Sequence, residues 1–158
     1  MKSLSFAFGA GLPARLFFSI AFLASMLVFS HTATAQAEGI WLNQDQTAHI
    51  EVYKGTGGKL YGKIIWLKEP NDEKGKAKTD PENPDPKLRS RSRMGMIVVS
   101  GFLPNGKDYW EGGIIYNPKD GKTYSCTMAL LPDGTLKLRG YIGISLIGKT
   151  QIWTRVKK

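Results

Sequence analysis

The chain has 158 residues, one cysteine and a formal net charge of +9 at neutral pH. A single cysteine excludes an internal disulfide, so the fold must be stabilised by its hydrophobic core. A basic chain can bind nucleic acid, anionic lipid or acidic polysaccharide, but the lysines and arginines here are scattered, which favours a role in solubility and in protecting strand edges.

The N-terminal segment has the pattern of a secretory signal peptide. Lys2 and Arg15 are followed by an apolar run of 14 residues, 16–29. This run is shorter than the roughly 20 residues that a membrane span requires. Small residues then offer cleavage after Ala35 or after Ala37. We therefore expect export; an anchor that is not cleaved is the alternative.

Removal of residues 1–35 would leave residues 36–158 as one domain in the periplasm or outside the cell, with no stable membrane span. This part contains all 13 acidic residues and all but two of the 22 basic ones, so its net charge is +7. It is long enough to bury a core without disulfides or metals. The sequence does not indicate an oligomeric state.

The remainder of the chain predicts an all-β domain of about eight strands. Apolar and polar residues alternate with a period of two, and no segment shows the period of 3.6 that is typical of a helix. Bulky side chains expected to point inward are Trp66, Trp110, Tyr116, Tyr124 and Met128, and Ile114 should share a face with Trp110. The expected strands are 39–42, 48–53, 60–67, 96–102, 109–116, 123–130, about 136–142 and about 146–156.

The turns between these strands predict an antiparallel up-and-down barrel. Compact turns rich in Gly, Asn and Asp occur at 54–58, 103–106 and 132–134, and alternate turns of a meander lie at the same end. The longer connections would then lie at the other end. The sequence thus predicts a closed floor and an open mouth, with an interior that is either filled by side chains or able to hold one small ligand.

Two residue patterns at the ends of the domain resemble the lipocalin, or calycin, family. Gly39-x-Trp41 opens the first strand and Arg155 lies near the end of the last. The resemblance implies that Gly39, Trp41 and Arg155 close the barrel floor. A cation over an indole ring contributes about 0.5–2 kcal/mol.

A second resemblance covers most of the domain. The chain is similar to the exported bacterial family DUF2147, which is catalogued as a domain of unknown function. The resemblance implies a lipocalin-like barrel and no established activity. It is carried by GKIIWL at 62–67, by residues 79–91, by GGIIYNP at 112–118 and DGKTY at 120–124, by LRGYIG at 138–143, and by TQIWTR at 150–155.

The connection 68–95 is the least ordinary part of the domain. A loop of this length without secondary structure is usually functional or disordered. It contains acidic and amide residues that can cap backbone amides, and alternating arginines that would point the same way if extended. One interpretation is a lid that grips an anionic group; the other, which we favour, is a structural loop whose aspartates pair with its arginines. The residues concerned are Asp80, Asn83, Asp85, Arg89, Arg91 and Arg93.

Other chemistries have weaker support. Asp80, Glu82, Asn83 and Asp85 offer oxygens for calcium, but the segment lacks the glycine turn and the bidentate glutamate of a calcium loop. Residues 36–158 contain one histidine and one cysteine, which makes a zinc site improbable, and we expect no metal and no cofactor. Asp108 and Glu111 could act as acid and base, although their spacing does not demand it.

The sequence therefore predicts a binding protein rather than an enzyme. The ligand would be a small amphipathic or anionic molecule at the barrel mouth, with Arg89, Arg91 and Arg139 near its anionic group. Nucleic acid is not expected, and no catalytic residue is assigned. The alternatives are a packed barrel that serves as a protein-interaction or envelope module, and a carboxylate-based hydrolase. The candidate ligand-binding residues are Trp66, Asp80, Asn83, Asp85, Arg89, Arg91, Trp110, Tyr116, Tyr124 and Arg139.

Overall fold

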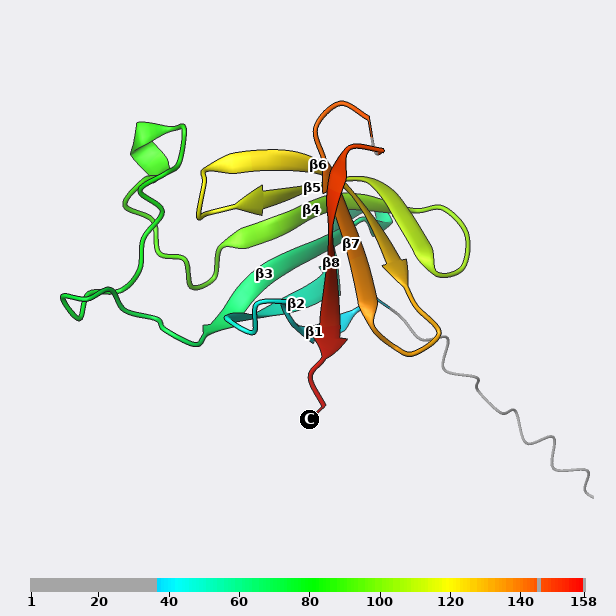
Figure 1. Ribbon diagram of the computed structural model, residues 1–158, viewed down its shortest axis with the longest axis horizontal. Helices are drawn as coiled ribbons and strands as arrows, with labels where there is room; N and C mark the ends of the chain where they lie inside the picture. Colours follow the sequence, from blue (N-terminus) through cyan, green and yellow to red (C-terminus); the bar gives the residue numbers. More distant parts are fainter. Residues whose placement is uncertain (1–36, 145, 158) are drawn as a thin grey trace, which may run out of the picture. The chain divides into compact units, whose positions relative to one another are not determined.

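The computed structural model describes residues 37–144 and 146–157, which form a closed β-barrel (Figure 1). Each strand is antiparallel to the next, and the last pairs with the first. This confirms the predicted all-β, eight-stranded up-and-down barrel. The predicted signal peptide, residues 1–35, lies outside the described residues. The strands are β1 (Gly39–Leu42), β2 (Ala48–Lys54), β3 (Leu60–Leu67), β4 (Ile97–Pro104), β5 (Tyr109–Asn117), β6 (Lys122–Leu130), β7 (Leu136–Tyr141) and β8 (Gly148–Arg155).

In residues 37–144 and 146–157, helical structure is limited to two 3₁₀ turns. One lies in the β2–β3 turn, at Thr56–Gly58, and the other in the long connection between β3 and β4, at Pro86–Leu88. Within the described ranges, no helix has the length and apolar character that crossing a membrane requires.

Alternation of side chains holds along β6. Cys126, Met128 and Leu130 are buried, while Ser125 lies exposed between Tyr124 and Cys126. The prediction that Met128 points inward is confirmed, and Cys126 and Leu130 lie on the same face. Successive residues of a strand point to opposite faces, so the face taken by one residue determines the face of every other residue in a regular strand.

A β-bulge reverses this alternation in β3. The pairing passes from His49 with Trp66 to Ile50 with Ile64, so β3 contains one extra residue here. Beyond the bulge, Leu67 rather than Trp66 faces the interior. Trp66 is 40% exposed, and its ring lies 4.4 Å from that of His49 on the outer face. The prediction that Trp66 points inward is therefore wrong.

A second bulge lies in β5. Trp110 pairs with Met128 and Gly113 pairs with Cys126, so β5 again has one residue more than its neighbour. Ile114 falls on the outer face and is 44% exposed. The prediction that Ile114 shares a face with Trp110 is wrong for the same reason.

The floor half of the barrel is filled. Trp41, Phe102, Met128 and Leu136 are fully buried there, at the end with the short turns. Gly113 makes this packing possible, because a Cβ atom at that position would overlap the Phe102 ring. The core therefore closes the barrel at one end.

Strands β1 and β8 close the barrel at this floor. Their register places Trp41 directly opposite Arg155, and the guanidinium carbon lies 4.2 Å from the centre of the indole ring. Arg155 Nη1 also donates a hydrogen bond to the carbonyl oxygen of Glu38, at 2.9 Å. Gly39 leaves room for this side chain, because a Cβ there would meet Nη1. The first and last strands are thus joined by side chains as well as by backbone.

Candidate functional site

The mouth half of the barrel is hollow. A cavity of about 970 Å³ opens among the longer connections. Cavities of about 300–1,000 Å³ are typical of sites for small organic molecules. The barrel is thus filled at its floor and open at its mouth. The apolar wall is made mainly by Ile50, Ile64, Leu67, Val98, Ile115 and Leu138.

A few polar groups interrupt this wall. Gln151 Oε1 accepts a hydrogen bond of 2.9 Å from Trp153 Nε1, and both residues line the cavity. Tyr124 Oη donates to Asp120 Oδ2 at 2.7 Å, and this hydrogen bond raises the pKa of Tyr124 above its ordinary value. The interior therefore combines an apolar wall with a small number of fixed polar atoms.

The single thiol also faces the cavity. Cys126 is 1% exposed, and burial raises the pKa of its thiol to about 12. A neutral thiol of this kind packs as a small apolar group and is a poor nucleophile at neutral pH.

Charged side chains surround the entrance. Two of its carboxylates form ion pairs, Asp45 with Lys119 at 3.1 Å and Glu69 with Lys78 at 3.0 Å. These pairs are exposed, so they add little to stability, but they balance the charge locally. Lys68, Arg93 and Lys149 also line the entrance and leave the rim positive.

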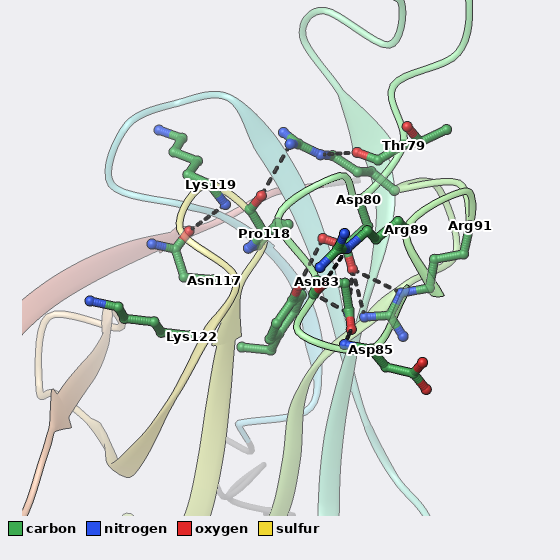
Figure 2. Close-up of polar contacts among 12 residues, drawn as sticks. Thr79, Asp80, Asn83, Asp85, Arg89, Arg91, Asn117, Pro118, Lys119 and Lys122 are labelled. Atoms are coloured by element: carbon green, nitrogen blue, oxygen red, sulfur yellow. Dashed lines mark hydrogen bonds and ion pairs between the residues drawn. The ribbon is translucent and has the colours of Figure 1, made fainter. Parts of the chain in front are cut away.

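The long connection between β3 and β4 is fastened to the barrel by Asp80 (Figure 2). Asp80 is fully buried. Its Oδ1 accepts a hydrogen bond of 2.8 Å from Tyr116 Oη on β5, and its Oδ2 accepts one of 2.7 Å from Asn83 Nδ2. Arg91 approaches Oδ2 with Nε at 3.0 Å and Nη2 at 2.9 Å. One carboxylate thus joins two parts of the loop to a strand.

The electrostatics of this cluster favour an ionised Asp80. Burial by itself raises the pKa of Asp80, but hydrogen bonds from Asn83, Tyr116 and Arg91 outweigh it, and the pKa is lowered from its ordinary value. Burial and the hydrogen bond to Asp80 raise the pKa of Tyr116. Both carboxylate oxygens are occupied by protein groups, so Asp80 is a structural acceptor rather than a calcium ligand.

The arginines of the loop serve separate contacts. Arg89 Nε donates to the carbonyl oxygen of Asn83 at 2.8 Å, whereas Arg93 donates to the carbonyl oxygens of Thr79 and Pro118. The segment is turned rather than extended, which removes the geometry in which the arginines of a lid would point the same way. The structural interpretation of the loop agrees with these contacts.

Asp85 departs from the ion pairing expected of it. Its Oδ1 accepts a hydrogen bond of 2.9 Å from the backbone N–H of Lys87 and so caps the 3₁₀ turn. Its own N–H donates to Asn83 Oδ1 at 2.9 Å. Short polar side chains commonly satisfy local amides in this way. The expectation that Asp85 pairs with a loop arginine is therefore corrected.

A close approach of backbone fixes the loop against the β5–β6 turn. Gly121 has a φ of +68°, and a Cβ there would overlap the carbonyl oxygen of Glu82 in the loop. Glycine meets both demands, since it accepts positive φ and has no side chain.

The ten residues predicted to bind the ligand thus lie in different parts of the structure. Of the ten, Tyr116 and Tyr124 line the cavity. Trp110 packs against the core, and Trp66 lies outside the barrel. Arg139 donates hydrogen bonds to Thr150 Oγ1 and to a carbonyl of the β7–β8 loop and lies outside the cavity lining. Arg89 and Arg91 likewise do not line the cavity. The remaining three, Asp80, Asn83 and Asp85, belong to the loop cluster.

Sequence reasoning missed the basic rim residues and the cavity glycine. Lys68 and Lys149 line the entrance, and Gly140 lines the wall. Lys68 directly follows an expected strand, and Gly140 and Lys149 lie within expected strands. Working out which strand ends lie at the mouth could therefore have identified the two lysines. Gly140 gives no comparable signal, because its role depends on the space opposite it.

Comparisons with known proteins agree with this geometry. No match was found among curated proteins. The chain is similar to the solved structure described as protein HP1028 from the human pathogen Helicobacter pylori, which is said to belong to the lipocalin family; the TM-score is 0.69 at 32% identity, over 78% of this chain and 84% of that one. Residues 39–155 match the family described as an uncharacterized protein conserved in bacteria, DUF2147. The chain belongs to the DUF2147 family and has its lipocalin-like barrel fold.

Proposed function

We propose that this protein is exported and binds a small amphipathic molecule, with the apolar part in the barrel cavity and an anionic group at the basic rim. The observation that carries the proposal is the cavity of about 970 Å³, with its apolar wall and positive entrance. Lys68, Arg93 and Lys149 are the groups that would face the anion. Small-molecule sites typically combine an apolar interior with a few polar contacts.

Two alternatives fit these features less well. A packed interaction module would need a filled interior, whereas the mouth half is hollow. A carboxylate-based hydrolase would need a convergent acid and base at the entrance. The carboxylates there are engaged separately: Asp45 with Lys119, Glu69 with Lys78, and Asp120 with a tyrosine hydroxyl.

The export part of the proposal has its own test. The apolar segment 16–29 and the small residues before Ala35 and Ala37 support cleavage on export. Mass spectrometry of periplasmic and membrane fractions measures the N-terminus directly. An intact Met1 found only in membranes would contradict the proposal.

The ligand part is tested by filling the cavity. Gly140 lines it, and a Cβ there would sit 3.6 Å from Ile115 and from Tyr124, which is ordinary contact. The remaining atoms of a Gly140→Leu side chain would occupy ligand space. The matched control is Lys137→Leu, on the same strand but exposed.

Binding is measured with a fluorescent long-chain fatty acid, and native mass spectrometry of gentle preparations detects any molecule that co-purifies. We expect Gly140→Leu to weaken fatty-acid binding at least about tenfold, because lost apolar contact of one or two methylenes suffices for that factor. Lys68→Gln should weaken binding of the acid but not of the corresponding alcohol. Failure of the native protein to bind any of these probes, with nothing co-purified, would refute the proposal.

A further inference from the structure

The loop between β7 and β8 carries the most exposed large aliphatic side chains of the described residues. Ile142, Ile144, Leu146 and Ile147 are 68%, 60%, 84% and 75% exposed, whereas no other large hydrophobic side chain there exceeds 47%. The loop extends beyond the ends of its two strands (Figure 1). A contiguous apolar group of this kind marks an interaction site, because leaving it in water is unfavourable.

Hydrogen bonds hold the backbone of this loop. Gly143 has a φ of +74°, and the N–H of Ile147 donates to the carbonyl oxygen of Ile144 at 3.2 Å. Arg139 Nη2 on β7 donates to the carbonyl oxygen of Leu146 at 3.0 Å. These hydrogen bonds connect Ile144 with Ile147 and Leu146 with β7.

The two strands that carry the loop have only positive charges. Residues 134–158 contain no aspartate or glutamate. Arg139 and Lys149 lie toward the loop, whereas Lys137 and Arg155 lie toward the floor. Lys149 is exposed and lies two residues after Ile147, at the cavity entrance. An apolar tip beside basic residues is complementary to a bilayer with anionic head groups.

A second copy of the chain is a poorer match for this surface. Two such loops would bring positive strands together, and four side chains fall short of the roughly 800 Å² that each partner of a stable dimer buries. The loop also adjoins the cavity, since Ile142 and Ile147 belong to the cavity lining and Ile144 and Leu146 do not.

We propose that the β7–β8 loop docks this protein on anionic phospholipid membranes. Ile144 and Leu146 enter the interfacial layer, and Lys149 faces the phospholipid head groups. Ile142 and Ile147 then hold the cavity entrance against the bilayer surface. This docking goes beyond the proposed ligand binding and does not depend on it.

Vesicle co-sedimentation tests the proposal, with vesicles of phosphatidylcholine alone and of equal parts phosphatidylcholine and phosphatidylglycerol. The protein is tested in the form that the cell produces, and mass spectrometry first identifies the N-terminal residue of that form. We expect binding to the anionic vesicles, and a loss of at least about tenfold in the Ile144→Ser, Leu146→Ser double variant. Lys149→Gln should weaken binding about fivefold on anionic vesicles only. The matched control is Leu103→Ser, which removes an aliphatic side chain that is 44% exposed at the opposite, floor end.

A second measurement reports insertion directly. In a Leu146→Trp variant, tryptophan emission should shift to shorter wavelength and be quenched by brominated phospholipid. No binding to anionic vesicles, or equal losses in the double variant and in Leu103→Ser, would overturn the proposal. Two other results would also overturn the proposal. In one, the double variant loses only fatty-acid affinity, which would make the loop a cover for its own cavity. In the other, the double variant loses only a concentration-dependent dimer.

Discussion

Replacement of Asp80 by asparagine removes the charge that holds the long β3–β4 connection to the barrel. Asp80 accepts hydrogen bonds from Tyr116, Asn83 and Arg91. An amide keeps one acceptor oxygen and places an NH₂ group against one of these donors. The change therefore destabilises the folded protein in two ways. It removes the carboxylate charge, and it places two hydrogen-bond donors against each other in a buried site.

The size of the effect follows from these contacts. A hydrogen bond to a charged group contributes about 1.5–3 kcal/mol, and an unsatisfied buried donor costs about 1–3 kcal/mol. Arg91 is 35% exposed, so water can replace part of its interaction. Because contacts within one network are not additive, we expect Asp80→Asn to lower the free energy of unfolding by about 2–4 kcal/mol.

Urea denaturation followed by fluorescence measures this free energy, and limited proteolysis reports separately on the loop. Asp85→Asn is the matched control: its carboxylate caps an exposed backbone amide, a contact of about 0.5–1 kcal/mol. Equal losses in the two variants, or a loss below about 0.5 kcal/mol for Asp80→Asn, would refute the assigned role of the buried carboxylate.

The same variant has a predicted pH dependence. The pKa of Asp80 is lower in the folded protein than the value of about 3.9 expected in the unfolded chain. The contribution of this group to stability is therefore complete above about pH 5 and is lost as pH falls below about 4, through the folded pKa. The difference in unfolding free energy between the native protein and Asp80→Asn should narrow in that range. A constant difference down to pH 2 would contradict the ionised assignment.

Two substitutions and one reactivity measurement test other parts of the structure. Arg155→Met should lower the unfolding free energy by about 1–2 kcal/mol in urea, through loss of the contact with Trp41; a change below about 0.3 kcal/mol would contradict that contact. Gly121→Ala should cost about 1–3 kcal/mol and speed proteolysis of the loop, and unchanged cleavage would argue against the close approach. The Cys126 thiol, with its pKa raised to about 12 by burial, should react with iodoacetamide at pH 8 about 1,000-fold more slowly than a small thiol, whereas a comparable rate would show that it is not buried.

The strands and the two ends of the barrel could be predicted because both signals are local. A period of two sets the face of each residue, and turn residues such as those at 103–106 mark a hairpin without reference to the rest of the chain. Trp66 and Ile114 could not be placed in this way. Each lies at or beyond a bulge, and a bulge depends on how a strand pairs with its neighbour, which is a tertiary property.

The candidate site was predictable only in part. The composition of the long loop identified it as unusual, but the choice of Asp80 as its central acceptor depends on Tyr116, which is 36 residues away in sequence. For the apolar loop after β7, the sequence predicted strand residues, whereas the structure shows exposed loop residues. Ile142 and Leu146 were expected in strands because apolar residues tend to be buried, yet burial is only a tendency and these two lie in solvent.

The two sides of the cavity entrance differ in a way that bears on both proposals. On one side the long loop is held by a buried carboxylate and by a close backbone contact at Gly121, so opening there must break several contacts together. On the other side the described aliphatic side chains of the β7–β8 loop are exposed rather than packed against the barrel. Regions with few buried contacts open at the lowest free energy. If both proposals hold, the ligand passes the β7–β8 side, where the bilayer supplies it, and Asp80→Asn should reduce stability while leaving the rate of ligand uptake from vesicles unchanged.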